Sequence, residues 1–198
     1  MQDLLDQLEI MSVIQNWALW RDSGEWDKLR TTVHRDAIMT ATWFHGRFDE
    51  FIEAARASWR KHSRSQHSLG GTTVELNRTR AIAQTRMTIL VRSELDGLEV
   101  DITCHGRFFD RVEKRNGAWR IARRSVIYEM DRIDPVRPGS RLALDPEVLR
   151  RFPEGYRHLA YVQSRSGAQV NPDLPTADPE SQKMLLREAK AWLAAAPQ

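Results

Sequence analysis

Apolar side chains recur at every third or fourth position at the start of the chain, which is the spacing of one buried helix face. These positions are Leu4, Leu8, Met11, Ile14 and Ala18. They predict a helix over residues 2–22, which Ser23 and Gly24 end. One further turn of the same face reaches Asp22, whose charge is disfavoured both by burial and by the C-terminal end of the helix dipole. We therefore take Asp22 as a candidate functional residue and expect a basic partner for it.

The segments that follow alternate between helical and extended patterns. Their order predicts a short helix at 25–33, a strand at 36–44, a turn at His45 and Gly46, and a third helix at 47–62.

The middle of the chain is rich in β-formers. Four long strands are predicted at 66–76, 78–95, 98–114 and 118–133. Asp96-Gly97 and Asn116-Gly117, which lie between them, are strong signals for two-residue hairpins. We therefore predict an α+β fold in which three N-terminal helices cover one face of a curved antiparallel sheet.

The composition changes after residue 133. All eight prolines lie between residues 135 and 197. We divide the chain into a domain over 1–133 and a C-terminal extension over 134–198, with helical pieces near 146–151 and 180–195. The extension is too short and too interrupted for a second domain, so we expect it to pack on the body, to cover a pocket or to contact another subunit. Its segment FPEGYRHLAY is a candidate lid.

Charge and motifs narrow the classes of function. The formal net charge is +3 and no block of five basic residues occurs, so we expect no nucleic-acid partner. The single cysteine, Cys104, excludes an intramolecular disulfide and favours the cytoplasm. The start lacks the basic region of a secretory signal, and no segment approaches the roughly 20 apolar residues of a membrane span. Phosphate-binding loops and metal-binding motifs are absent, so we expect no cofactor and no metal.

His67 is the histidine best placed for chemistry. It opens the first long strand, in SQHSLGG, where the chain enters the sheet beside the helices. An aspartate that holds a neutral imidazole makes a general base, because the carboxylate fixes the tautomer and stabilises the imidazolium that forms. A pair of Asp22 and His67 would meet this description. The alternative is that His67 is a hydrogen-bonded core residue with no catalytic role.

Four stretches of the sequence together resemble the SnoaL-like branch of the NTF2-like superfamily. They are LWRDSGEWDKL, TWFHGRFDEF, SQHSLGG and GRFFDRVEKRNGAWRIARR, in this order, and the resemblance covers about residues 5–133. It implies a cone in which a curved antiparallel sheet wraps around helices and encloses an internal pocket. The likeness is greatest to lyases of the branch, which include hexachlorocyclohexane dehydrochlorinase, scytalone dehydratase and bile acid dehydratase. Those enzymes use no cofactor, and Asp22 and His67 match the positions of their Asp and His.

The resemblance adds further site residues. Arg124 follows Trp119 by five residues, as an Arg does in the dehydrochlorinase, and would support a leaving group or an oxyanion. The candidate substrate-binding residues are Trp17, Trp43, Phe108 and Tyr128. Tyr128 is included because alternation along a strand puts it on the same side as Arg124, and the aromatic residues would suit a flat apolar substrate. The second catalytic histidine of scytalone dehydratase has no match, since this chain offers Leu90, Val91 and Arg92 there.

These observations predict a cofactor-independent lyase that removes water, or another small group such as formaldehyde, from a small apolar aromatic substrate. Two alternatives remain, an isomerase and a non-catalytic subunit or binding module. A hydrogen bond between Asp22 and His67 inside an open cavity would favour the enzyme, whereas burial without a cavity would favour the others. We also expect a homodimer or homotrimer, because a curved sheet of this type leaves an apolar outer face.

Overall fold

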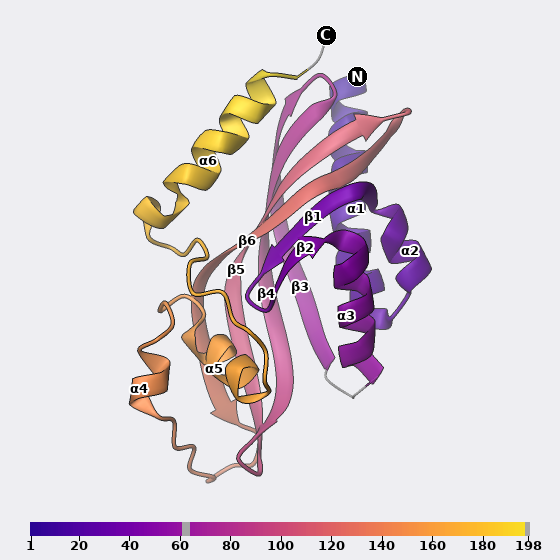
Figure 1. The fold of residues 1–198 in the computed structure, drawn as a ribbon. Coiled ribbons are helices and arrows are strands. Elements are labelled where there is room, and N and C mark those ends of the chain that lie inside the picture. The colour runs from indigo at the N-terminus through magenta and orange to yellow at the C-terminus, as the bar shows by residue number, and fades with distance from the viewer. Residues whose placement is uncertain (61–63, 197–198) are drawn as a thin grey trace.

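The computed structural model describes residues 1–60 and 64–196 (Figure 1). A six-stranded sheet forms the centre, in the order β2-β1-β6-β5-β4-β3. Its strands are β1 (Val33–Ala41), β2 (Phe44–Arg47), β3 (Arg64–Asn77), β4 (Arg80–Leu95), β5 (Leu98–Arg115) and β6 (Ala118–Pro135). Asp96-Gly97 and Asn116-Gly117 turn the chain with positive φ at all four residues, as a tight hairpin of this type requires. The predicted α+β class and the long hairpin strands are therefore confirmed.

The sheet is mixed, whereas the sequence led us to expect an antiparallel one. β1 runs parallel to β6, with Met39 opposite Arg124, and the other strand pairs are antiparallel. The two parallel strands are far apart in the sequence. No hairpin therefore fixes their relative direction, and local turn signals carry no information about it.

The expected turn at His45 and Gly46 is also wrong. Both residues belong to the short strand β2, where His45 lies opposite Thr40 and Gly46 opposite Met39. The chain turns earlier, at Thr42 and Trp43. A four-residue strand is too short to show a periodic pattern, so its residues resemble a turn in the sequence.

Three N-terminal helices lie against one face of the sheet (Figure 1). They are α1 (Gln2–Ser23), α2 (Trp26–Thr31) and α3 (Phe48–Arg60), and the predicted end of the third helix at 62 lies outside the described residues. Gly24 ends α1 in the left-handed conformation, with φ of 75°, which glycine adopts at little cost. The end predicted for α1 is confirmed.

The buried face of α1 differs from the predicted stripe. Leu4 and Leu8 are 56% and 51% exposed. The N-terminal half of the helix instead turns Asp6 and Ile10 inward, and the Asp6 carboxylate accepts a hydrogen bond of 2.7 Å from Lys114 of β5. A paired carboxylate thus belongs to the buried face, which apolar spacing alone does not reveal.

The C-terminal extension packs on both faces of the sheet. It contains α4 (Pro146–Leu149), α5 (Arg157–Arg165) and α6 (Pro179–Ala194). α6 covers the face opposite α1, where Ala189 packs with Phe109 and Ile127 (Figure 1). α5 joins the main core together with α1, and the preceding Gly155 lies so close to β6 that a Cβ there would stand 2.3 Å from the Tyr128 carbonyl oxygen. The described helices include none that is both long and apolar enough for a bilayer span.

Candidate active site

Asp22 and His67 form a hydrogen-bonded pair between the end of α1 and the start of β3. One carboxylate oxygen of Asp22 accepts the backbone N–H of His67 at 2.5 Å, and the other lies 2.7 Å from His67 Nδ1. The carboxylate therefore fixes both the backbone and the ring of the histidine. Since an ionised carboxylate only accepts, we assign the ring proton to Nδ1, which leaves the lone pair of Nε2 available as a base.

Burial and neighbouring charges keep this histidine neutral. The side chains of His67 and Asp22 are 8% and 14% exposed. Burial lowers the pKa of His67, and the positive charges of Arg21 and Arg124 lower it further, while Asp22 opposes them in part. Nη1 of Arg21 also lies 3.4 Å from Oδ1 of Asp22, so the Asp22 carboxylate is paired with Arg21 as well as with His67. A neutral imidazole near neutral pH is the state that a general base requires.

Aromatic rings and one buried guanidinium enclose the pair. The rings of Trp17 and Phe108 lie 5.5 and 5.9 Å from that of His67. Arg124 lies over both aromatic rings, at 4.1 Å from Trp17 and 3.9 Å from Phe108, which is close enough for cation–π attraction. We call Trp17, Asp22, His67, Phe108 and Arg124 the dyad cluster. Its members come from α1, β3, β5 and β6, so the fold brings together five predicted site residues that are far apart in the sequence.

Arg124 is held from behind by Asp110, a residue that sequence reasoning missed. Nε and Nη2 of Arg124 each donate to Asp110 at 2.7 Å, and both side chains are fully buried. Burial raises the pKa of Asp110, and the charge of Arg124 counteracts this. Alternation from Phe108 could have identified the residue, because Asp110 is two positions further on the same strand face and lies directly opposite Arg124.

Two buried N–H donors of the dyad cluster have no hydrogen-bond partner among residues 1–60 and 64–196. They are Nη1 of Arg124 and Nε1 of Trp17, and both residues are at most 1% exposed. An unsatisfied buried donor costs about 1–3 kcal/mol, so such groups call for an explanation. Both residues contact one another beside His67, and a substrate oxygen or leaving group would satisfy them.

The structure does not bring Trp43 and Tyr128 to the pair. Trp43 lies in the turn after β1 and contacts Phe51, which separates it from Trp17. Tyr128 is buried on the expected side of β6, but it lies four residues beyond Arg124, about 13 Å along the strand. Its hydroxyl accepts the N–H of Thr42 at 3.2 Å and its ring lies 5.0 Å from that of Tyr156. Both side chains have structural contacts of their own.

An open groove reaches the pair from one side. It has a volume of about 920 Å³ and runs between the end of α1, the start of β3 and the adjoining parts of β4 and β5. Asp22 lines it together with apolar residues such as Leu90 and Ile102, whereas His67 lies behind Asp22 and is not part of its lining. The sequence analysis asked for a hydrogen bond between Asp22 and His67 inside an open cavity. The hydrogen bond is present, whereas only Asp22 of the two residues lines the groove.

A second aspartate–histidine pair occurs in the C-terminal extension. Asp131 of β6 accepts the backbone N–H of His158 at 2.7 Å and lies 2.8 Å from its Nδ1. It also accepts the N–H of Leu159 at 2.8 Å, so it caps the first turn of α5 and anchors that helix to the sheet. Within the described residues, no group of three or more His, Cys, Asp or Glu is arranged to hold a metal ion.

Comparison with known proteins identifies the class. The SnoaL-like domain family matches residues 2–125, so the chain belongs to this family. Pea pathogenicity protein 2 of Fusarium vanettenii is 32% identical over 201 residues, which cover 96% of this chain and 86% of the relative.

Two solved structures show the same fold at low sequence identity. A scytalone dehydratase-like protein from Novosphingobium aromaticivorans aligns with a TM-score of 0.57 and 17% identity, over 72% of this chain and 100% of that one. A type 2 hexachlorocyclohexane dehydrochlorinase, LinA, aligns with a TM-score of 0.57 and 14% identity, over 73% of this chain and 97% of that one. The predicted SnoaL-like, NTF2-like membership is confirmed, and at such identities the two structures establish the fold alone.

Proposed function

We propose that this protein is a lyase that works without a cofactor, with His67 as its general base. The observation that carries the proposal is the contact of Asp22 with both the backbone N–H and Nδ1 of His67. This contact leaves Nε2 as the basic atom, and burial lowers the pKa of the ring so that the base is unprotonated near neutral pH. The structural pair Asp131–His158 makes the same contact, so the surroundings of His67 complete the argument. The rings of Trp17 and Phe108 and the guanidinium of Arg124 enclose His67.

The chemical step follows from the placement of the groups. Nε2 of His67 takes a proton from the substrate carbon next to the one that bears the leaving group. The electron pair of that C–H bond forms the new double bond, and the leaving group departs with its own bonding pair. The carboxylate of Asp22 stabilises the imidazolium while it exists, and the imidazolium can return its proton to a departing hydroxide as water.

The unpartnered donors of the dyad cluster are suited to stabilising the leaving group or an oxyanion. Nη1 of Arg124 and Nε1 of Trp17 would bind the leaving group or an oxyanion that develops on the substrate. Asp110 keeps the guanidinium oriented through its two hydrogen bonds, so little reorganisation is needed as charge develops.

The surroundings favour a small, largely apolar substrate with a flat ring. Trp17 and Phe108 present aromatic surface beside His67. The groove at Asp22 has a mixed lining, in which apolar residues such as Leu90 and Ile102 stand among polar and charged ones such as Arg92. Two lyase-type proteins with the same fold support this class of reaction, although neither determines the substrate. Water is the leaving group we favour. Formaldehyde would be released from an aromatic 1,3-diol if Nε2 of His67 instead took the hydroxyl proton of a CH2OH group. The C–C bond of that group then breaks, its electron pair forms the new double bond, and the second hydroxyl departs and takes up the proton as water.

The test is mass spectrometry of a panel of apolar aromatic alcohols and diols incubated with the wild type, His67→Ala and His105→Gln. His105 is a matched control, because it is also a half-buried strand histidine but pairs with Thr88 rather than Asp22. We expect loss of water or formaldehyde with the wild type and the control, and none with His67→Ala. Binding of panel members without turnover by the wild type would contradict the lyase and favour a binding module.

A further inference from the structure

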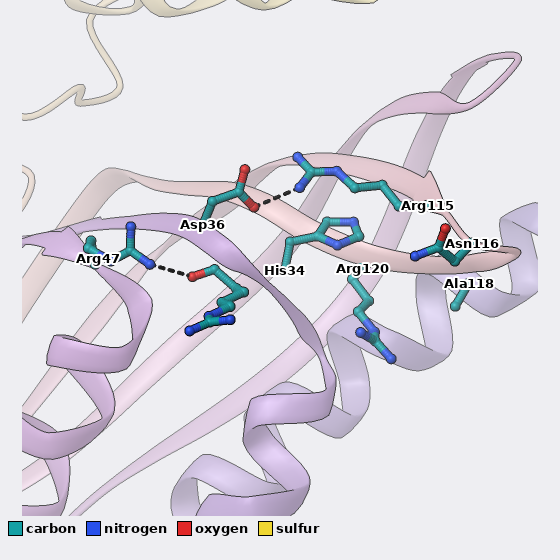
Figure 2. A pocket seen from close by; sticks show the side chains of 8 residues that line it. His34, Asp36, Arg47, Arg115, Asn116, Ala118 and Arg120 are labelled. Carbon is teal, nitrogen blue, oxygen red and sulfur yellow. Dashed lines mark hydrogen bonds and ion pairs between the residues drawn. The ribbon is translucent and has the colours of Figure 1, made fainter.

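A second pocket lies where β1 and β2 approach the hairpin between β5 and β6 (Figure 2). It has a volume of about 560 Å³ and is lined chiefly by Arg35, Arg47, Arg115 and Arg120, with His34 and Asp36. It is separate from the dyad cluster. Lys114, next to Arg115 in the chain, bonds to Asp6 near the start of α1, and Asp22 lies about 24 Å further along that helix.

Most of the positive charge in this pocket is not compensated. Arg115 donates to Asp36 at 2.7 Å and also pairs with Glu113, so its charge is neutralised. Arg35, Arg47 and Arg120 have no carboxylate partner among the described residues. The guanidinium of Arg47 instead donates to the backbone carbonyl oxygen of Arg35 at 2.8 Å (Figure 2). Three like charges around one pocket repel one another, and a bound anion would relieve that repulsion.

The floor of the pocket is rigid and uncharged. His34 is 6% exposed, and its Nε2 bonds to the backbone carbonyl oxygen of Glu113 at 2.9 Å. Burial lowers the pKa of His34, and the charge of Arg115 lowers it further. The ring is therefore neutral near pH 7, so the arginines supply the positive charge of the pocket.

We propose that this arginine pocket binds a small molecule through a phosphoryl group. A guanidinium contacts two oxygens of an anion at a time, and Arg35, Arg47 and Arg120 approach from three different strands, β1, β2 and β6. A tetrahedral phosphoryl group has enough oxygens in different directions for all three, whereas a planar carboxylate has two in one plane. The volume leaves space for an organic part beyond the phosphoryl group.

Isothermal titration of the full-length protein with inorganic pyrophosphate tests this proposal. The variant is Arg35→Gln/Arg120→Gln, and the matched control is Arg137→Gln/Arg151→Gln, which removes two exposed arginines outside the pocket. Because each charge-assisted contact changes affinity by about tenfold or more, we expect the pocket variant to bind at least about tenfold more weakly than the wild type. The control variant should bind as the wild type does. Equal affinity of the two double variants, or no binding by the wild type, would overturn the proposal.

Two further titrations at equal ionic strength identify the ligand chemistry. Titration with glycerol 3-phosphate tests whether a phosphate monoester binds as well as the inorganic ion. Titration with citrate tests whether carboxylate groups are sufficient for binding. We expect glycerol 3-phosphate to show the same dependence on Arg35 and Arg120, and citrate to bind at least fivefold more weakly than pyrophosphate. Citrate binding as tight as that of pyrophosphate would overturn the assignment to phosphoryl groups. Since neither arginine belongs to the dyad cluster, turnover by the pocket variant should match the wild type.

Discussion

The two aspartate–histidine pairs of this protein share one geometry but differ in their surroundings. In each, a carboxylate binds the backbone N–H and Nδ1 of the histidine, with Nδ1 distances of 2.7 Å at His67 and 2.8 Å at His158. His67 is 8% exposed, touches two aromatic rings and lies near the buried Arg124, whereas His158 is 25% exposed. Asp131 also caps α5, which gives the second pair a structural role.

The difference teaches that the carboxylate–imidazole contact alone does not define a general base. The contact fixes a tautomer in both places. At His67 burial lowers the pKa of the ring, and unpartnered donors of Trp17 and Arg124 lie beside it. We therefore expect changes around the two pairs to have separable effects, on turnover at the first and on the docking of α5 at the second.

The largest effect on stability is expected at the buried ion pair between Asp110 and Arg124, which supports the dyad cluster. Asp110→Asn leaves the guanidinium of Arg124 without its ionised partner in a fully buried position, which should cost about 3–5 kcal/mol of unfolding free energy. Asp101→Asn is the matched control, since Asp101 makes the same two-bond contact with Arg92 at the surface and should cost at most about 1 kcal/mol. Urea denaturation measures both, and equal losses would contradict the importance of burial at Arg124.

A smaller effect is expected at the second pair. Asp131→Asn weakens the cap of α5, which should cost about 1–2 kcal/mol and increase amide hydrogen exchange at Leu159 and in the helix that follows. Asp22→Asn should leave exchange in α5 unchanged. If both variants loosened α5 to the same degree, the two pairs would not be independent.

A still smaller effect is expected in the pH dependence of stability, which reports on His67. Because folding lowers the pKa of His67 below the value of about 6.5 in an unfolded chain, the unfolded state binds more protons at mildly acidic pH. Stability from this group is therefore fully present above pH 6.5 and is lost as the pH falls below it, by at most about 1.4 kcal/mol per pH unit.

The variant His67→Gln removes that contribution. Thermal unfolding between pH 5 and 7.5 should therefore depend less on pH in His67→Gln than in the wild type. A pH dependence that is unchanged, or steeper, in the variant would show that His67 is not held neutral by the fold.

Much of the site was accessible from the sequence because its residues stand at the ends of strong local patterns. Asp22 lies two residues before the Gly24 that ends α1, and His67 lies near the start of a long strand. These two positions follow local patterns, so both residues could be proposed from the sequence. Arg124 is a candidate through the resemblance, by its spacing after Trp119. The pairing of β6 with β5 is unbroken from Arg124 to Tyr128, which keeps these two residues on one side of the strand.

The missed features depend on contacts between distant parts of the chain. Alternation from Phe108 puts Asp110 on the inner face of β5, but its pairing with Arg124 depends on the register between β5 and β6. The partner of Asp131 lies in an extension whose docking no local rule predicts. α5 shows four consecutive buried residues from Leu159 to Val162, because it packs inside the core rather than on its surface. At nine residues, the helix is also too short for its apolar spacing to repeat often enough to be recognised.

The most direct test of the central claim compares His67→Gln with His158→Gln on a substrate that the wild type turns over. Each variant removes an imidazole that an aspartate contacts at both the backbone N–H and Nδ1, and each keeps a polar side chain at that position. If His67 is the general base, kcat/KM falls by about 10²- to 10⁴-fold in His67→Gln and changes by less than about threefold in His158→Gln. Equal kcat/KM in the two variants would contradict the claim that the buried pair is the catalytic one.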